Sequence, residues 1–237
     1  MPIFLFAMIF FTLSGFAIET SPPDFSFQDG QAVFVDFKHA HYKMTFDFKK
    51  RTSTIVAKIK FFQDKTGYPI FDIRTEIKDI KINSSSTSAS EVMPPKAETT
   101  IRVLNQPLAS GFHELEVTSD VGEFAGGIEF RGGKLDFDFS LSDLEDREFF
   151  EIWSATNLEF DQFPSEIEIA ILNTKIEHTV YHNGTMELKQ KNSFKIKFPE
   201  YFATSSTFLH IAPVNAYRET SFNILSKTGR DIPVTIY

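Results

Sequence analysis

The sequence predicts an all-β protein, a large antiparallel β-sandwich or saddle-like sheet domain with one short helix. Many short segments alternate apolar and polar residues, and turn residues separate them at roughly regular spacing. Phenylalanine occurs 28 times against a single tryptophan, and aromatic side chains favour strands. Only one segment beyond the N-terminal residues has the period and the capping residues of a helix.

Composition sets limits on size and partners. A chain of 237 residues that is 42% hydrophobic can bury the core of one large β domain or of two small ones. The net charge of −8 and the pI of about 5.3 argue against a nucleic-acid partner, because no basic stripe is present to displace counterions. The absence of cysteine excludes disulfides and thiolate metal sites.

The N-terminus has the pattern of a targeting segment. Residues 3–16 are nearly all apolar, and the first charged side chain is Glu19. Gly15 and Ala17 are small residues suited to a cut after Ala17, although no Lys or Arg precedes the apolar run. We therefore expect a signal peptide and an exported protein, periplasmic or secreted, with no stable membrane span after cleavage. A retained membrane anchor and a wrongly assigned start site are the alternatives.

The expected organisation has three parts: residues 1–17 as the signal peptide, residues 18–30 as a linker and residues 31–237 as one β domain. The domain opens with two alternating segments, His41–Lys49 and Ile55–Phe61, which predict an antiparallel hairpin.

The middle of the chain is also predicted to form strands. Strands are expected at Ile77–Ile82, Thr99–Leu104 and Phe112–Thr118. The Ser-, Thr- and Pro-rich segment Asn83–Lys96 predicts a mobile loop. Double glycines at 126–127 and 132–133 indicate bulges or turns, because they lack the spacing of a nucleotide-binding loop.

One segment changes period. Ser142 and Glu145 form a capping box, and further acids follow in the first turn, where the helix dipole favours them. These features predict a short helix from about Asp143 to Trp153.

The next segment, Asn157–Ile171, is irregular up to Pro164 and then alternates as a clean strand. A strand at Ile176–His182 runs into Asn183-Gly184, a strong signal for a type I′ hairpin turn. Strands at Phe194–Phe198 and Thr207–Ile211 follow. A terminal hairpin joins residues 222–225 to residues 232–236.

Candidate chemistry is sparse, and no catalytic or cofactor-binding residue is predicted. His39 and His41 share one face of a strand and are weak candidates for a metal pair, with a surface pair as the alternative. His178 and His182 have the helical spacing of zinc ligands, but on a strand they lie about 13 Å apart. They also lack the glutamate of a His-Glu-x-x-His motif.

Several segments, taken in order, resemble the N-terminal β domain of the aminopeptidase N family of zinc metallopeptidases. The resemblance spans nearly all of the chain after the N-terminal segment. It is carried by Tyr42–Phe48 with Ile55–Phe61, Gly67–Ile73, Gly111–Leu115, Asn157–Ile171, Phe198-Pro199 with Thr204–Ile211, and Lys227–Tyr237.

The resemblance implies a scaffold without its own chemistry. In this family zinc and catalysis belong to a following domain with Gly-Ala-Met-Glu-Asn and His-Glu-x-x-His motifs, and neither motif occurs here. Gln162 lies in the wrong place to match the substrate-facing residue that the family's β domain contributes. We therefore expect a non-catalytic domain, truncated or acting as a stand-alone interaction module, without cofactors.

Two alternatives remain open. The chain could be the non-catalytic part of a split zinc aminopeptidase whose catalytic domain is encoded separately and becomes its partner. A weaker alternative is an independent structural or adhesive sandwich, although a single tryptophan offers little for stacking on sugars.

Overall fold

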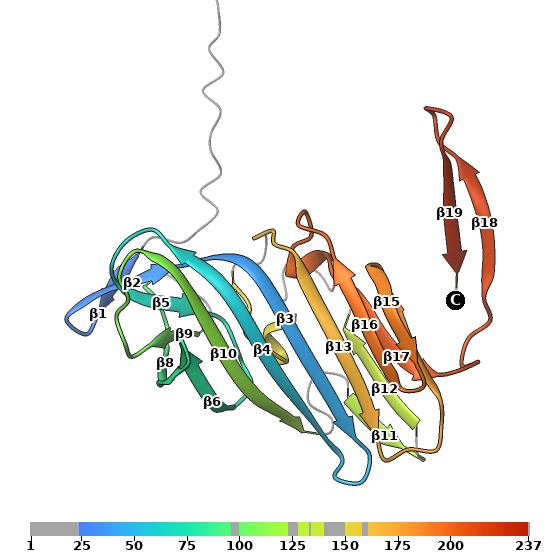
Figure 1. Cartoon of the computed structure of the whole chain (residues 1–237), viewed down its shortest axis with the longest axis horizontal. Coiled ribbons are helices and arrows are strands. Elements are labelled where there is room, and N and C mark those ends of the chain that lie inside the picture. Colours follow the sequence, from blue (N-terminus) through green and yellow to red (C-terminus); the bar gives the residue numbers. More distant parts are fainter. Residues whose placement is uncertain are drawn as a thin grey trace, which may run out of the picture.

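The computed structural model describes residues 24–95, 100–122, 128–132, 134–139, 150–157 and 161–236. These residues form an all-β structure of four sheets, with eight, five, four and two strands. Figure 1 shows the five-stranded sheet at one end of the body and the C-terminal hairpin extending away from the other end. The predicted fold class is confirmed.

The eight-stranded sheet is the largest of the four sheets, and its strand order is β15-β16-β13-β3-β4-β10-β6-β7. Its strands are β3 (Asp36–Asp47), β4 (Thr52–Gln63), β6 (Ile77–Ile82), β7 (Ser85–Ser86), β10 (Gly111–Gly122), β13 (Ser165–Leu172), β15 (Thr185–Gln190) and β16 (Ser193–Phe198). The predicted first hairpin is confirmed as the β3–β4 pair, in which Tyr42 lies opposite Ala57 and Met44 opposite Ile55.

The four-stranded sheet covers the inner face of the large sheet. Its strands, in the order β11-β12-β17-β14, are β11 (Ile128–Arg131), β12 (Lys134–Phe139), β14 (His178–His182) and β17 (Leu209–Pro213). The alternation seen in the sequence places apolar side chains of both sheets in one core, which includes Met44, Ile169, Ile196 and Ile211.

The five-stranded sheet has its own small core. Its strands, in the order β1-β2-β5-β9-β8, are β1 (Phe25–Phe27), β2 (Gly30–Phe34), β5 (Tyr68–Phe71), β8 (Ala89–Val92) and β9 (Ile101–Leu104). Tyr68, Ile70 and Val103 are buried there with Ala32. The described part of residues 18–30, predicted to be a linker, already includes strand β1.

Strand pairing is not purely antiparallel. β13 runs parallel to β3 over its whole length, with Ile167 opposite Tyr42 and Ile169 opposite Met44. β2 and β5 are also parallel. Alternation fixes which face of a strand is buried, but both directions of pairing satisfy it, so the sequence did not reveal this feature.

The loop predicted at Asn83–Lys96 is wrong for most of its length. Asn83 and Ser84 have positive φ values of 49° and 68°, the conformation of a type I′ turn, and they join β6 to β7. The chain then continues as β8, which pairs with β9. Backbone hydrogen bonding therefore orders a segment whose side chains alone suggest a loop.

The hairpin predicted at Asn183-Gly184 is also wrong. β14 pairs with β17 in the four-stranded sheet, whereas β15 pairs with β16 in the eight-stranded sheet. Asn183 Nδ2 donates to Ser206 O (2.7 Å), and Asn183 Oδ1 accepts from Phe208 N (2.9 Å). A Cβ at Gly184 would lie 2.5 Å from Lys197 O, so this glycine lets the chain pass close to β16 as it changes sheets.

The helix predicted at Asp143–Trp153 is described only at its end. Phe150–Ile152 form a single 3₁₀ turn, η2, in place of the expected α-helix, and residues 143–149 lie outside the described residues. Phe150 and Trp153 are buried in the main core, and the Ser119 hydroxyl donates to Trp153 O (2.9 Å). A second 3₁₀ turn, η3, covers Thr204–Ser206.

The predicted terminal hairpin is confirmed as β18 (Thr220–Leu225) paired with β19 (Asp231–Ile236). It stands apart from the body in Figure 1. Across the part of the chain that the structure describes, no helix combines the length and the apolar character needed to cross a membrane. The expected signal peptide, residues 1–17, lies outside the described residues.

Candidate functional site

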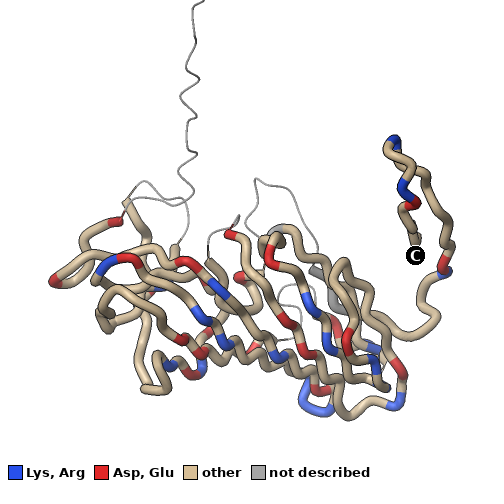
Figure 2. Tube along the Cα trace, turned by 45° about the horizontal axis from the view of Figure 1, so that its top comes forward, with Lys and Arg blue, Asp and Glu red and all other residues tan. Residues whose placement is uncertain are grey.

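The outer face of the large sheet carries a ladder of opposite charges. Lys195 Nζ lies 2.8 Å from Glu166 Oε2, and Lys197 Nζ lies 2.7 Å from Glu187 Oε1. The hydrogen bond from Lys195 lowers the pKa of the Glu166 carboxyl. Figure 2 shows Lys and Arg interspersed with Asp and Glu along these strands. Each exposed pair contributes about 0–1 kcal/mol, so the ladder indicates a solvated sheet face more than a reactive site.

His39 and His41 lie on β3 within this ladder. His41 Nε2 is 3.3 Å from Glu168 Oε1, without the alignment of a hydrogen bond. Burial lowers the pKa of His39, against the raising effect of Glu166. No group of three or more His, Asp or Glu residues among the described ones could hold a metal ion. The two histidines therefore remain a weak sequence-based prediction.

His178 is a structural residue of the core. Its Nε2 accepts from Leu135 N (2.9 Å), and its Nδ1 lies 3.1 Å from Ile176 O, to which it donates. Burial lowers the pKa of His178, although hydrogen bonds with Asn192 and Ile176 raise it. A neutral ring is required, because Nε2 must remain an acceptor. The expectation that His178 and His182 lie on one strand is confirmed.

A polar node joins Asn157 and Asp161 to the main chain at the start of β3. Asn157 Nδ2 donates to Asp161 Oδ2 (2.6 Å) and to Val35 O, and Asp161 Oδ2 also accepts from Phe37 N (3.1 Å). Burial raises the pKa of Asp161, while the bonds from Phe37 and Asn157 lower it. All of these contacts hold local backbone, so the node supports the scaffold.

Gln162 is exposed and forms only a β-bridge with Ala203. It lines neither the cavity between β6 and β8 nor the cavity beside Lys195. The structure therefore brings none of the histidines, nor Gln162, together into a catalytic arrangement.

The most unusual surface lies on the terminal hairpin. Phe222 is opposite Val234 and Ile224 is opposite Ile232, so these four side chains share one face with Ile236. We call these five residues the apolar hairpin face. Phe222, Ile224 and Ile236 are 44%, 48% and 55% exposed. The alternation of β18 and β19 was visible in the sequence, but it normally indicates a face buried by the protein's own core.

No protein-family model matches the chain, and no curated protein matches its sequence. Solved structures do match. Together with the sheets described above, they define the class: the chain has the fold of part of an M1 zinc metallopeptidase. The resemblance expected from the sequence is thus confirmed as a resemblance of fold.

The similar structures include an M1 zinc metallopeptidase from Deinococcus radiodurans, with 11% identity and a TM-score of 0.57 over 87% of this chain. Legionella pneumophila aminopeptidase A has 12% identity and a TM-score of 0.55 over 85%. Yeast LTA4 hydrolase has 10% identity and a TM-score of 0.56 over 79%. The chain spans 47%, 24% and 30% of these three chains, respectively.

Proposed function

We propose that this chain is a non-catalytic, exported β domain, homologous to the N-terminal domain of zinc aminopeptidases, that works as a protein interaction module. The observation that carries the proposal is the apolar hairpin face. A two-stranded hairpin is marginally stable by itself, and exposed contiguous apolar residues are typical of interaction surfaces. All six residues of β18 are exposed, whereas core strands such as β13 alternate buried and more exposed residues.

The proposal that the chain is non-catalytic rests on its sequence. Neither a His-Glu-x-x-His nor a Gly-Ala-Met-Glu-Asn motif occurs in the 237 residues. The first of these motifs supplies two zinc ligands and a general base, which a metallopeptidase needs to activate water. We therefore expect the purified protein to show no aminopeptidase activity. Activity that a chelator removes and zinc restores would refute this part of the proposal.

The interaction role has its own test. A photo-crosslinking amino acid placed at Phe222, on the apolar hairpin face, should capture one defined partner in cells that produce the protein. The same amino acid at Phe112, which is 73% exposed on the body, is the matched control. Equal capture at both positions, or none at Phe222, would contradict the assignment.

A second candidate function is the non-catalytic half of a split zinc aminopeptidase. The partial coverage of the similar structures favours it, since each of them contains further chain. The partner captured at Phe222 would then contain a His-Glu-x-x-His motif, and mixing the two chains would produce chelator-sensitive activity. A partner without this motif would favour the stand-alone module.

Export is tested separately. We propose cleavage after Ala17, so that the mature protein starts at Ile18. Intact mass measurement of the protein from its native host would show this start. A mass that retains residues 1–17 would indicate the anchored alternative.

A further inference from the structure

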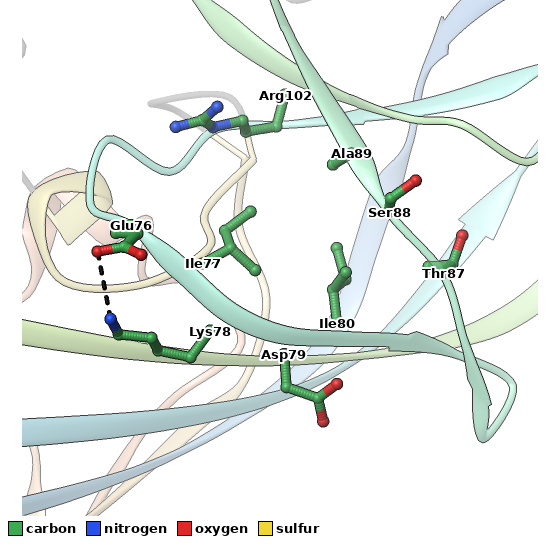
Figure 3. Close-up of a pocket in the computed structure, with 9 residues that line it drawn as sticks. All are labelled: Glu76, Ile77, Lys78, Asp79, Ile80, Thr87, Ser88, Ala89 and Arg102. Atoms are coloured by element: carbon green, nitrogen blue, oxygen red, sulfur yellow. Dashed lines mark ion pairs between the residues drawn. The ribbon is translucent and has the colours of Figure 1, made fainter.

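Strands β6 and β8 diverge and leave a gap between two sheets. The hairpin of β6 and β7 is hydrogen-bonded as far as Thr87 N, which donates to Ile80 O (3.0 Å). Beyond Thr87 the chain leaves β6 and pairs with β9 instead. The gap, which we call the β6–β8 wedge, is a cavity of about 400 Å³. Its lining residues are Glu76, Ile77, Lys78, Asp79, Ile80, Thr87, Ser88, Ala89 and Arg102, all labelled in Figure 3.

On the β6 side, the main chain is already paired. Asn83 N donates to Glu114 O (2.8 Å), which fixes the alternation of the β6–β10 ladder. By that alternation, Lys81 and Asp79 face β10, and the main-chain groups of Ile80 face away from it. Because Ile80 O already accepts from Thr87 N, β6 contributes side chains to the wall of the wedge and not a free edge.

The β8 side differs. Asn105 N donates to Ser88 O (2.9 Å), so Ser88 and then Ser90 face β9. The main-chain groups of Ala89 and Glu91 therefore point to the other side of the strand. Among the described strands, β8 is the last of the five-stranded sheet, and no described strand pairs with this edge. One open strand edge thus borders the cavity.

The side chains around the wedge determine what it accepts. Ile80 is buried, and Ile77 and Ala89 pack partly against the main core. In Figure 3, Ile77 and Ile80 lie on the side of β6 that faces Ala89, and Lys78 and Asp79 lie on the other side. The wedge therefore has an apolar wall on the side of β6 that faces the open edge of β8.

The charges near the wedge cancel in pairs. Lys78 Nζ lies 3.2 Å from Glu76 Oε2, and Arg102 Nη1 lies 2.8 Å from Glu91 Oε2. Arg102 Nε also donates to Ile73 O (3.2 Å). The lining set has two acids and two bases, so it has no net charge. An uncharged segment complements such a site better than a phosphate or a nucleic acid.

We propose that the β6–β8 wedge binds an extended, uncharged segment of a partner polypeptide as an added strand. Main-chain groups of the segment would pair with Ala89 and Glu91 on the open edge of β8, as in other cases of strand addition. One apolar side chain of the segment would contact Ile77, Ile80 and Ala89. This site shares no residue with the apolar hairpin face, so its test does not depend on the function proposed above.

The test uses the mature full-length chain labelled with ¹⁵N and a short synthetic peptide of alternating valine and threonine. Its twin is N-methylated on every second residue, which removes the donors of one edge while keeping the side chains. The peptide should shift the amide signals of Ala89 and Glu91 and slow their hydrogen exchange. The twin should bind roughly tenfold more weakly or not at all, as expected for the loss of main-chain hydrogen bonds. Equal binding of both peptides, shifts confined to other residues, or no shifts would overturn the proposal.

A pair of variants locates the site. Ala89→Pro removes the N–H that faces the wedge and leaves the groups that face β9 in place, a change tolerated on edge strands. Ala89→Ser keeps that N–H. Peptide binding should fall roughly tenfold in the proline variant and stay near the wild-type level in the serine variant. Wild-type binding by Ala89→Pro would refute the site. If this variant does not fold, the comparison of the two peptides on the wild-type chain still decides.

Discussion

Asn157 donates a hydrogen bond of 2.6 Å to the carboxylate of Asp161, and the same carboxylate oxygen accepts from the backbone of Phe37. This contact joins the segment that precedes β13 to the start of β3, two parts of the chain separated by more than a hundred residues. β3 and β13 then run side by side as the parallel pair at the centre of the large sheet. The node therefore lies where a parallel pairing begins.

We expect Asn157→Ala to lower the free energy of unfolding by about 1–3 kcal/mol, because Val35 O loses its donor and the Asp161 carboxylate keeps only the bond from Phe37 N. Asp161→Asn keeps an acceptor for Phe37 N and should cost less than about 1 kcal/mol. Urea denaturation of both variants measures this. Equal costs would show that the carboxylate charge, rather than the hydrogen bonds, maintains the node.

Gly184→Ala should destabilise the fold by about 1–3 kcal/mol, because its Cβ would overlap Lys197 O and the side chains of Ile196 and Phe198. Gly122→Ala is the matched control, since no atom lies within 4 Å of a Cβ at that position. The control should change stability by less than about 0.5 kcal/mol. Thermal denaturation that gave both variants the same midpoint would contradict the close approach at the sheet change.

The buried histidines make stability depend on pH. Burial lowers the folded-state pKa of His178 and His182, so below about pH 6.5 the unfolded chain binds protons that the folded chain does not. Stability is therefore complete above the unfolded pKa and is lost as the pH falls below it. The loss from each such histidine approaches about 1.4 kcal/mol per pH unit.

His178→Gln should reduce this slope, because glutamine can donate to Ile176 O and accept from Leu135 N without titrating. Unfolding free energies measured between pH 7.5 and 5 provide the comparison, a range of roughly one unit on either side of the histidine value. An unchanged slope would mean that His178 does not contribute to the acid sensitivity.

Ile224→Ala and Ile169→Ala are the same substitution on two different strands. Ile224 is 48% exposed on the terminal hairpin, and Ile169 is 1% exposed on β13. We expect the first variant to change stability by less than about 0.5 kcal/mol and the second to cost about 2–5 kcal/mol. A large cost for Ile224→Ala in the isolated chain would show that the chain itself already covers the apolar hairpin face.

The two turns that contain asparagine show how far the sequence could predict the fold. Asn183-Gly184 has the preferred type I′ residues, yet the chain there passes from one sheet to another. Asn83-Ser84 lies in a Ser- and Thr-rich segment and forms the positive-φ turn of a hairpin. Local preference amounts to a few tenths of a kcal/mol up to about 1 kcal/mol, and the pairing of whole strands outweighs it.

The sequence by itself determined the β character of the chain, the inward face of each long strand, and the β3–β4 and β18–β19 hairpins. Alternation encodes these features directly, because side chains on a strand change faces at every residue. The order and spacing of its segments also predicted the metallopeptidase-like fold.

Only the tertiary structure decided the parallel pairing of β3 with β13, the sheet change at Gly184 and the open edge of β8 at the β6–β8 wedge. It also decided that the alternating residues of β18 and β19 form an exposed face. The physical reason is the same in each case. These features depend on which distant strand supplies the hydrogen-bonding partner or the covering surface, and a local pattern of residues does not specify that partner.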